Sequence, residues 1–71
     1  DLPRAHALRG NALFRLDRYS EAVDAFTKAV AGEPNPDKSW NQMLMASYFE
    51  LNQPQDAARI AEQIAAKDPD D

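Results

Sequence analysis

Turn-forming residues divide this 71-residue chain into four segments of similar length, and this spacing constrains the fold more than any other feature. They gather at 17–20, 32–36, 52–54 and 68–69. A proline inside a helix lacks an N–H and clashes with the preceding turn, so helices are expected to end near these breaks. The intervening segments are about 4–16, 20–32, 38–51 and 54–67. Because they exceed the usual strand length and are rich in helix formers, they predict four helices and no sheet.

Individual residues at the breaks favour particular helix ends. Asp37 and Ser20 have short polar side chains that suit a helix N-cap. Pro54 suits a first helical position, where its missing N–H is not needed. Gly32 suits the C-terminal end of the second segment. Short loops between such ends predict antiparallel neighbours.

Apolar residues recur within the segments at the period of an amphipathic helix. In the first segment they form one arc that we expect to face the core: Ala5, Leu8, Ala12 and Leu16. The second segment has an equivalent arc: Ala22, Val23, Phe26, Ala29 and Val30. The third segment is apolar on nearly all sides and is expected to be the most buried helix, whereas the fourth is narrow and rich in alanine.

Composition excludes several classes of function. The net charge of −4 argues against general binding to nucleic acid or to an anionic membrane surface. No apolar run approaches the roughly 18 residues of a membrane span, so membrane insertion is not expected. Cysteine is absent, His6 is the only histidine, and there is no glycine-rich phosphate loop. We therefore expect no catalytic residue, no metal site, no cofactor and no enzymatic activity.

The four segments are two copies of one unit. A shift of 35 residues aligns the chain with itself without a gap and matches five identical pairs at positions where helices pack or end. These pairs are Phe14 with Phe49, Leu16 with Leu51, Ala22 with Ala57, Ala31 with Ala66, and Pro34 with Pro69. The chain is therefore expected to be a single domain, 1–71, with one repeat at about 3–36 and a second at about 38–71.

The first unit resembles the tetratricopeptide repeat, whose pattern has Trp, Leu, Gly and Tyr in its first helix, then Ala and Phe, then Pro. The matching residues are Gly10, Ala22, Phe26, Ala29 and Pro34, with Tyr19 at the turn between the two helices. Leu13 stands at the tyrosine position of the first helix. His6 and Arg9 depart from the pattern, at the tryptophan and leucine positions.

The second unit is more divergent. It keeps Leu44, Tyr48, Ala57 and Pro69. Met45 replaces the small glycine and Ala61 replaces the aromatic residue, so the two changes compensate in volume. At the turn position where such repeats often have glycine, Asp17 and Asn52 tolerate the left-handed conformation.

The resemblance implies an all-α fold, a fragment of an α-solenoid built from two stacked antiparallel helix hairpins. It also implies a non-enzymatic adaptor or scaffold that binds a peptide or partner protein in a concave groove. Carrying over the family's geometry, the groove residues are Arg4, Ala7, Asn11, Phe14, Arg15, Ser39, Gln42, Met43, Ala46 and Phe49. Members that clamp chaperone tails need Lys and a second Asn where this chain has Ala7 and Met43, so that ligand class is not expected.

The charge along the groove predicts the sign of the ligand. Arg4 and Arg15 make the local potential positive, so we expect an acidic or C-terminal-carboxylate peptide to be preferred. The alternative is that these arginines only form a solvated stripe.

A second hypothesis is structural. Ile60 and Ile64, with neighbouring alanines, are expected to form an exposed apolar face that drives weak homo-oligomerisation or stacking within a longer repeat array.

Overall fold

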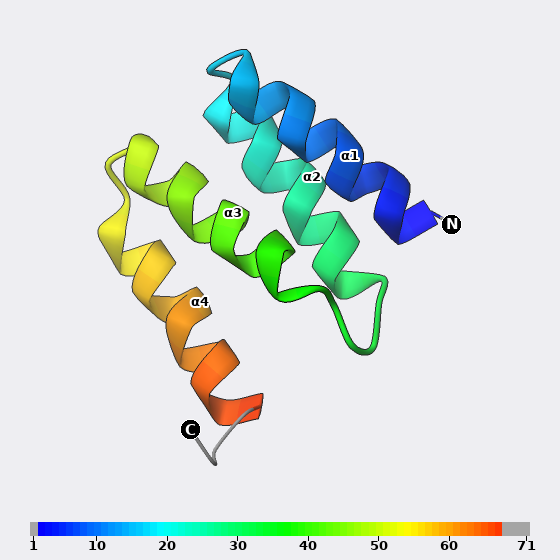
Figure 1. The fold of residues 1–71 in the computed structure, drawn as a ribbon. Coiled ribbons are helices and arrows are strands. Elements are labelled where there is room, and N and C mark those ends of the chain that lie inside the picture. Colours follow the sequence, from blue (N-terminus) through cyan, green and yellow to red (C-terminus); the bar gives the residue numbers. More distant parts are fainter. Residues whose placement is uncertain (1, 68–71) are drawn as a thin grey trace.

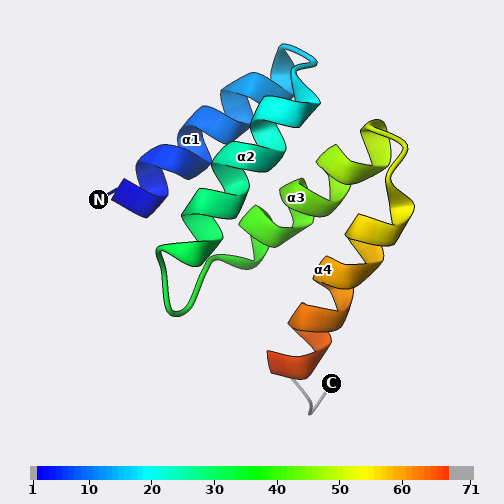
Figure 2. The same cartoon turned by 180° about the vertical axis from the view of Figure 1, so that it is seen from behind.

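The computed structural model of the chain describes residues 2–67, with Lys67 by its backbone alone. These residues form four helices and no strand: α1 (Leu2–Arg15), α2 (Tyr19–Ala31), α3 (Lys38–Glu50) and α4 (Pro54–Lys67). Each helix runs antiparallel to the next, and the two hairpins stand side by side with α2 against α3 (Figures 1 and 2). The result is a thin slab of 36 × 31 × 14 Å. The predicted all-α fold of two stacked hairpins is confirmed.

The turn within each hairpin has the same hydrogen bonds. Asp17 and Asn52 have φ angles of 62° and 60°, the left-handed conformation expected from the sequence. After α1, the N–H of Arg18 donates to the carbonyl of Leu13 at 2.9 Å. The equivalent bond in the second hairpin, 35 residues later, joins Gln53 to Tyr48 at 2.8 Å. Both turns satisfy the last carbonyls of the preceding helix in the Schellman arrangement.

Three of the four predicted helix ends are confirmed. Asp37 caps α3, because its carboxylate accepts the backbone N–H of Ser39 at 2.9 Å. Pro54 is the first residue of α4, and Gly32 ends α2. Ser20 is not an N-cap: α2 begins at Tyr19, and the residue before it makes no side-chain cap.

The core is centred on α2, not on α3 as the sequence predicted. Four residues of α2 are at most 1% exposed: Ala22, Ala25, Phe26 and Ala29. In α3 only Leu44 and Ser47 are buried, and Phe49 remains 61% exposed. The small residues of α2 let α1 and α3 approach it from both sides, whereas no described element covers the outer part of α3.

The apolar arc predicted to turn α1 inward faces outward instead. The buried residues of α1 are Ala7, Gly10 and Leu13. Leu8 and Leu16, from the predicted arc, are 65% and 66% exposed. Gly10 determines this orientation, because a Cβ there would lie 2.7 Å from the ring of Phe26. The helix therefore turns its smallest residue toward the largest side chain of the core.

Candidate partner-binding surface

The residues predicted to line a groove come from α1 and α3, and the structure leaves most of them accessible. The exposed ones are Arg4, Asn11, Arg15, Ser39, Gln42 and Phe49. Phe14, Met43 and Ala46 are half-buried. Ala7 is a correction, because it is 2% exposed and belongs to the core cluster. A lysine at this position would bury a charge, which is a second reason not to expect a ligand of the chaperone-tail class.

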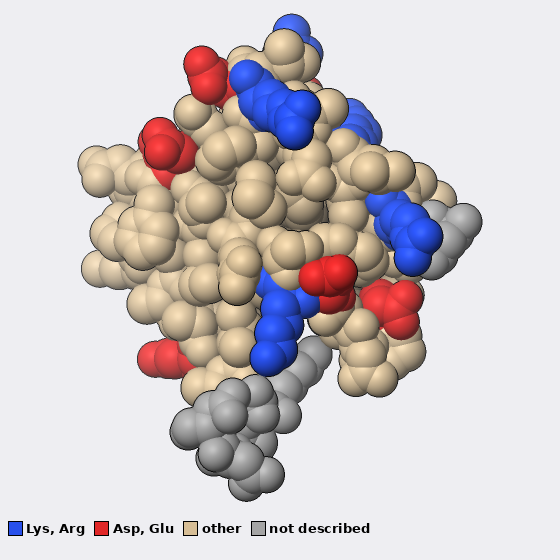
Figure 3. Space-filling model, in the orientation of Figure 1, with Lys and Arg blue, Asp and Glu red and all other residues tan. Residues whose placement is uncertain are grey.

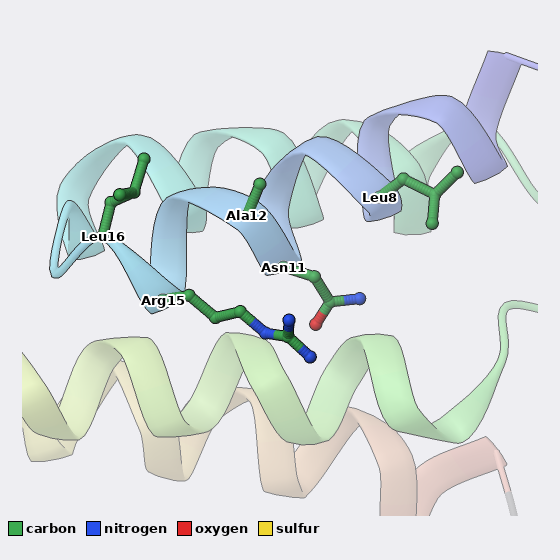
Figure 4. Close-up of a pocket in the computed structure, with 5 residues that line it drawn as sticks. All are labelled: Leu8, Asn11, Ala12, Arg15 and Leu16. Carbon is green, nitrogen blue, oxygen red and sulfur yellow. The ribbon is translucent and has the colours of Figure 1, made fainter.

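On α1 a shallow, open depression lies beside the predicted groove. It is lined by Leu8, Asn11, Ala12, Arg15 and Leu16 (Figure 4). Asn11 and Arg15 extend toward α3, whereas Ala12 and Leu16 point away from it. The depression therefore joins two surfaces, a polar one that faces α3 and an apolar one that faces outward. The sequence reasoning missed the apolar surface, because it assigned Leu8, Ala12 and Leu16 to the core.

The two aromatic residues of the groove differ in their freedom to contact a ligand. The ring of Phe14 packs edge-on against Tyr19, with centroids 5.1 Å apart and planes at 75°. The Tyr19 hydroxyl in turn donates to Asp17 at 2.8 Å. This hydrogen bond is the main reason why the pKa of Tyr19 is raised above its ordinary value. Phe14 is thus held in place by its own hairpin, and Phe49 is the free aromatic side chain of this surface.

Two polar residues at the start of α3, Asp37 and Ser39, are hydrogen-bonded to each other. The hydroxyl of Ser39 donates to the Asp37 carboxylate at 2.9 Å, so this side chain serves the helix cap. The hydrogen bonds from Ser39 lower the pKa of Asp37, and the positive charge of Arg4 lowers it further. The positive charge of Arg4 therefore already stabilises a carboxylate of the chain itself, that of Asp37. Arg15, which lies at the other end of α1, is the stronger candidate for binding a partner's carboxylate.

Charged side chains do not gather into one patch on this view of the molecule. Figure 3 shows Lys and Arg interspersed with Asp and Glu over a largely uncharged surface. Any selectivity for an acidic partner on this face must therefore come from individual arginines at contact distance, since the face in this view carries no broad basic field.

The face predicted for self-association is only partly open. Ile60 is half-buried and packs against the core cluster, and Ile64 is also half-buried. The exposed apolar residues of α4 beside them are alanines: Ala58, Ala61 and Ala65. Self-association through this face stays a prediction.

Among residues 2–67, no helix has both the length and the apolar character needed to cross a membrane. The same residues contain no group of three or more histidines and acids that are placed to hold a metal ion.

Comparison with known protein families gives a match over most of the chain. A family model described as a tetratricopeptide repeat matches residues 13–71. The match begins in α1, continues through the second hairpin and includes both left-handed turns. Searches against curated proteins and against solved structures gave no match.

Proposed function

Because this chain belongs to the tetratricopeptide repeat family, whose members are generally protein–protein interaction modules, we propose that it is a non-enzymatic adaptor that binds a peptide across α1 and α3. The expected ligand is a short segment with a large hydrophobic side chain next to acidic groups.

The exposure of Phe49 carries this proposal. Its side chain is 61% exposed although its equivalent in the first hairpin, Phe14, is packed against Tyr19. An exposed aromatic residue beside half-buried Met43 and Ala46 offers an apolar anchor for a partner.

Arginine chemistry supports the acidic preference. α1 contains Arg4, Arg9 and Arg15 and no acidic residue. Arg15 and Asn11 extend toward α3, so a ligand that crosses the two helices meets one guanidinium and one amide (Figure 4). A guanidinium holds a carboxylate through two parallel hydrogen bonds, which a peptide without any carboxylate cannot form.

Titration of labelled peptides tests the proposal. Acidic and basic peptides that share one leucine are added to the chain, and fluorescence anisotropy follows binding. We expect micromolar affinity for the acidic peptide, which weakens as salt is added. Arg15→Glu should reduce this affinity about tenfold or more, and Phe49→Ala should weaken both peptides. Lys28→Glu is the matched control, since it makes the same charge change on an exposed side chain of α2. Equal binding of the two peptides, or equal effects of Arg15→Glu and Lys28→Glu, would refute the proposed role of α1.

A further inference from the structure

Charges of opposite sign stand at equivalent positions of the two hairpins, at one end of the predicted groove. Arg15 is the last residue of α1, and the residue 35 positions later, at the end of α3, is Glu50. Both side chains are exposed. α1 and α3 run in the same direction, since each is antiparallel to α2 (Figures 1 and 2). The internal repeat therefore places a cation and an anion on opposite sides of the groove, both toward the helix ends.

Glu50 belongs to the face of α3 that was assigned to the groove. It follows Ala46 by one helical turn and Met43 by two turns, and residues at these spacings share a face. It is also the sequence neighbour of Phe49, the exposed aromatic residue of the groove. A ligand that packs on Phe49 therefore lies close to this carboxylate.

A carboxylate of the first hairpin adds to the negative charge at this end. The Tyr19 hydroxyl donates to Asp17 at 2.8 Å. This hydrogen bond is the main reason why the pKa of Tyr19 is raised, and the charges of Asp17 and Glu50 raise it further. The two carboxylates thus act on one hydroxyl from different hairpins. Both are exposed, so a cationic group of a ligand can approach them together.

Arg15 presents its charge at a different place in the groove. Its side chain extends toward α3, and its guanidinium lies beside the Asn11 side chain, away from the turn that follows α1 (Figure 4). Within residues 2–67, neither Arg15 nor Glu50 forms an ion pair with another residue of that range. Both signs of charge are therefore open to a ligand.

We propose that Glu50, together with Asp17, makes the groove select a peptide that carries an acid and a base on opposite sides of a large hydrophobic residue. The acid pairs with Arg15, the hydrophobic side chain packs on Phe49, and the base lies against Glu50 and Asp17. This inference rests on the proposed function and narrows it, because a peptide with acids on both sides would bring one of them against the two carboxylates.

The spacing of the helices sets the spacing of the two ligand charges. α1 and α3 are in contact beside α2. Neighbouring helices lie about 8–10 Å apart, and an extended peptide advances about 3.3 Å per residue. The acid and the base of the ligand should therefore stand about three residues apart, which leaves room for the hydrophobic residue between them.

Three kinds of labelled peptide test the inference. The mixed peptide has one Asp and one Lys about three positions apart around a leucine, and it is made in both orders. The diacidic and dibasic peptides have two Asp or two Lys at the same positions, and all termini are acetylated or amidated. Fluorescence anisotropy at low salt measures each affinity. We expect the better of the two mixed peptides to bind about fivefold more tightly than the diacidic peptide, because it gains one exposed ion pair and avoids one repulsion.

Charge reversal in the protein should change this preference. Glu50→Lys should favour the diacidic peptide, and Arg15→Glu should favour the dibasic one. The double variant of Arg15→Glu with Glu50→Lys keeps the wild-type net charge, and it should prefer the mixed peptide again. Glu62→Lys is the matched control for Glu50→Lys, since it makes the same charge change on an exposed side chain of α4. All three positions are exposed, so circular dichroism should show the wild-type helix content for every variant.

Two results overturn the inference and leave the proposed function in place. One is a diacidic peptide that binds the wild type as tightly as the mixed peptide. The other is a Glu50→Lys variant with the same order of affinities as Glu62→Lys. Phe49→Ala should weaken every peptide alike, so it reports on the proposed function alone. A wild type that binds none of the peptides overturns both.

Discussion

Replacing Gly10 with alanine should destabilise the protein although alanine is the better helix former. A Cβ at this position would lie 2.7, 2.8 and 2.9 Å from three ring atoms of Phe26. Ordinary contact between carbon atoms is about 3.5–4.0 Å, so the overlap is too large to be absorbed without movement. The ring cannot move into solvent, because Phe26 is 0% exposed in the centre of the core.

The net effect follows from two opposed terms. Gly→Ala inside a helix contributes about 0.5–1 kcal/mol of stability. Forcing an extra carbon into a well-packed core costs about 1–3 kcal/mol. We expect the free energy of unfolding to fall by about 1 to 2 kcal/mol. For a domain of this size that corresponds to a decrease in Tm of about 4–15 °C.

Chemical and thermal denaturation monitored by circular dichroism measure the change. Gly32→Ala is the matched control, because its Cβ would lie 3.2 Å from the Pro3 ring at the surface and its φ of −88° suits alanine. We expect that variant to differ from wild type by no more than about 0.5 kcal/mol. Phe26→Leu combined with Gly10→Ala should cost less than the sum of the two single changes, since the overlap is relieved. A Gly10→Ala protein that is more stable than wild type would refute the packing argument and leave only helix propensity.

Two further predictions concern the helix ends. Asn52→Gly should raise the free energy of unfolding and Asn52→Ala should lower it, each by about 1 kcal/mol. The φ angle there is 60°, and a Cβ without a polar group disfavours that conformation. Urea unfolding measures both changes, and effects of the same sign would contradict the account of the turn. Asp37→Ala should lower Tm at neutral pH by removing the cap of α3, and the difference from wild type should shrink in acid. The pKa of Asp37 is lowered in the folded state, so its stabilisation is present above the ordinary carboxyl pKa of about 3.9 and is lost as the pH falls through the folded value. A difference that stays constant down to pH 2 would show that the charge of Asp37 does not contribute.

The sequence by itself determined that there are four helical segments, where the breaks between them fall, and that the chain repeats. Pro54 and Asp37 specify helix starts through local chemistry, and Asp17 and Asn52 specify the two left-handed turns in the same way. These effects depend on residues within one turn of the backbone, so no knowledge of the fold is needed to infer them. The start of α2 differs from the prediction: the sequence favours a start at Ser20, whereas the helix begins at Tyr19 without a side-chain cap.

Only the tertiary structure decided which side of each helix is covered. α1 has apolar residues on two sides, one with Ala7 and Leu13 and one with Leu8 and Leu16, and periodicity cannot rank them. The packing of Gly10 on Phe26 turns the first side inward and leaves the second in solvent. Burial is a property of neighbours, and in a stack of repeats the same face is core when a helix precedes it and surface when none does.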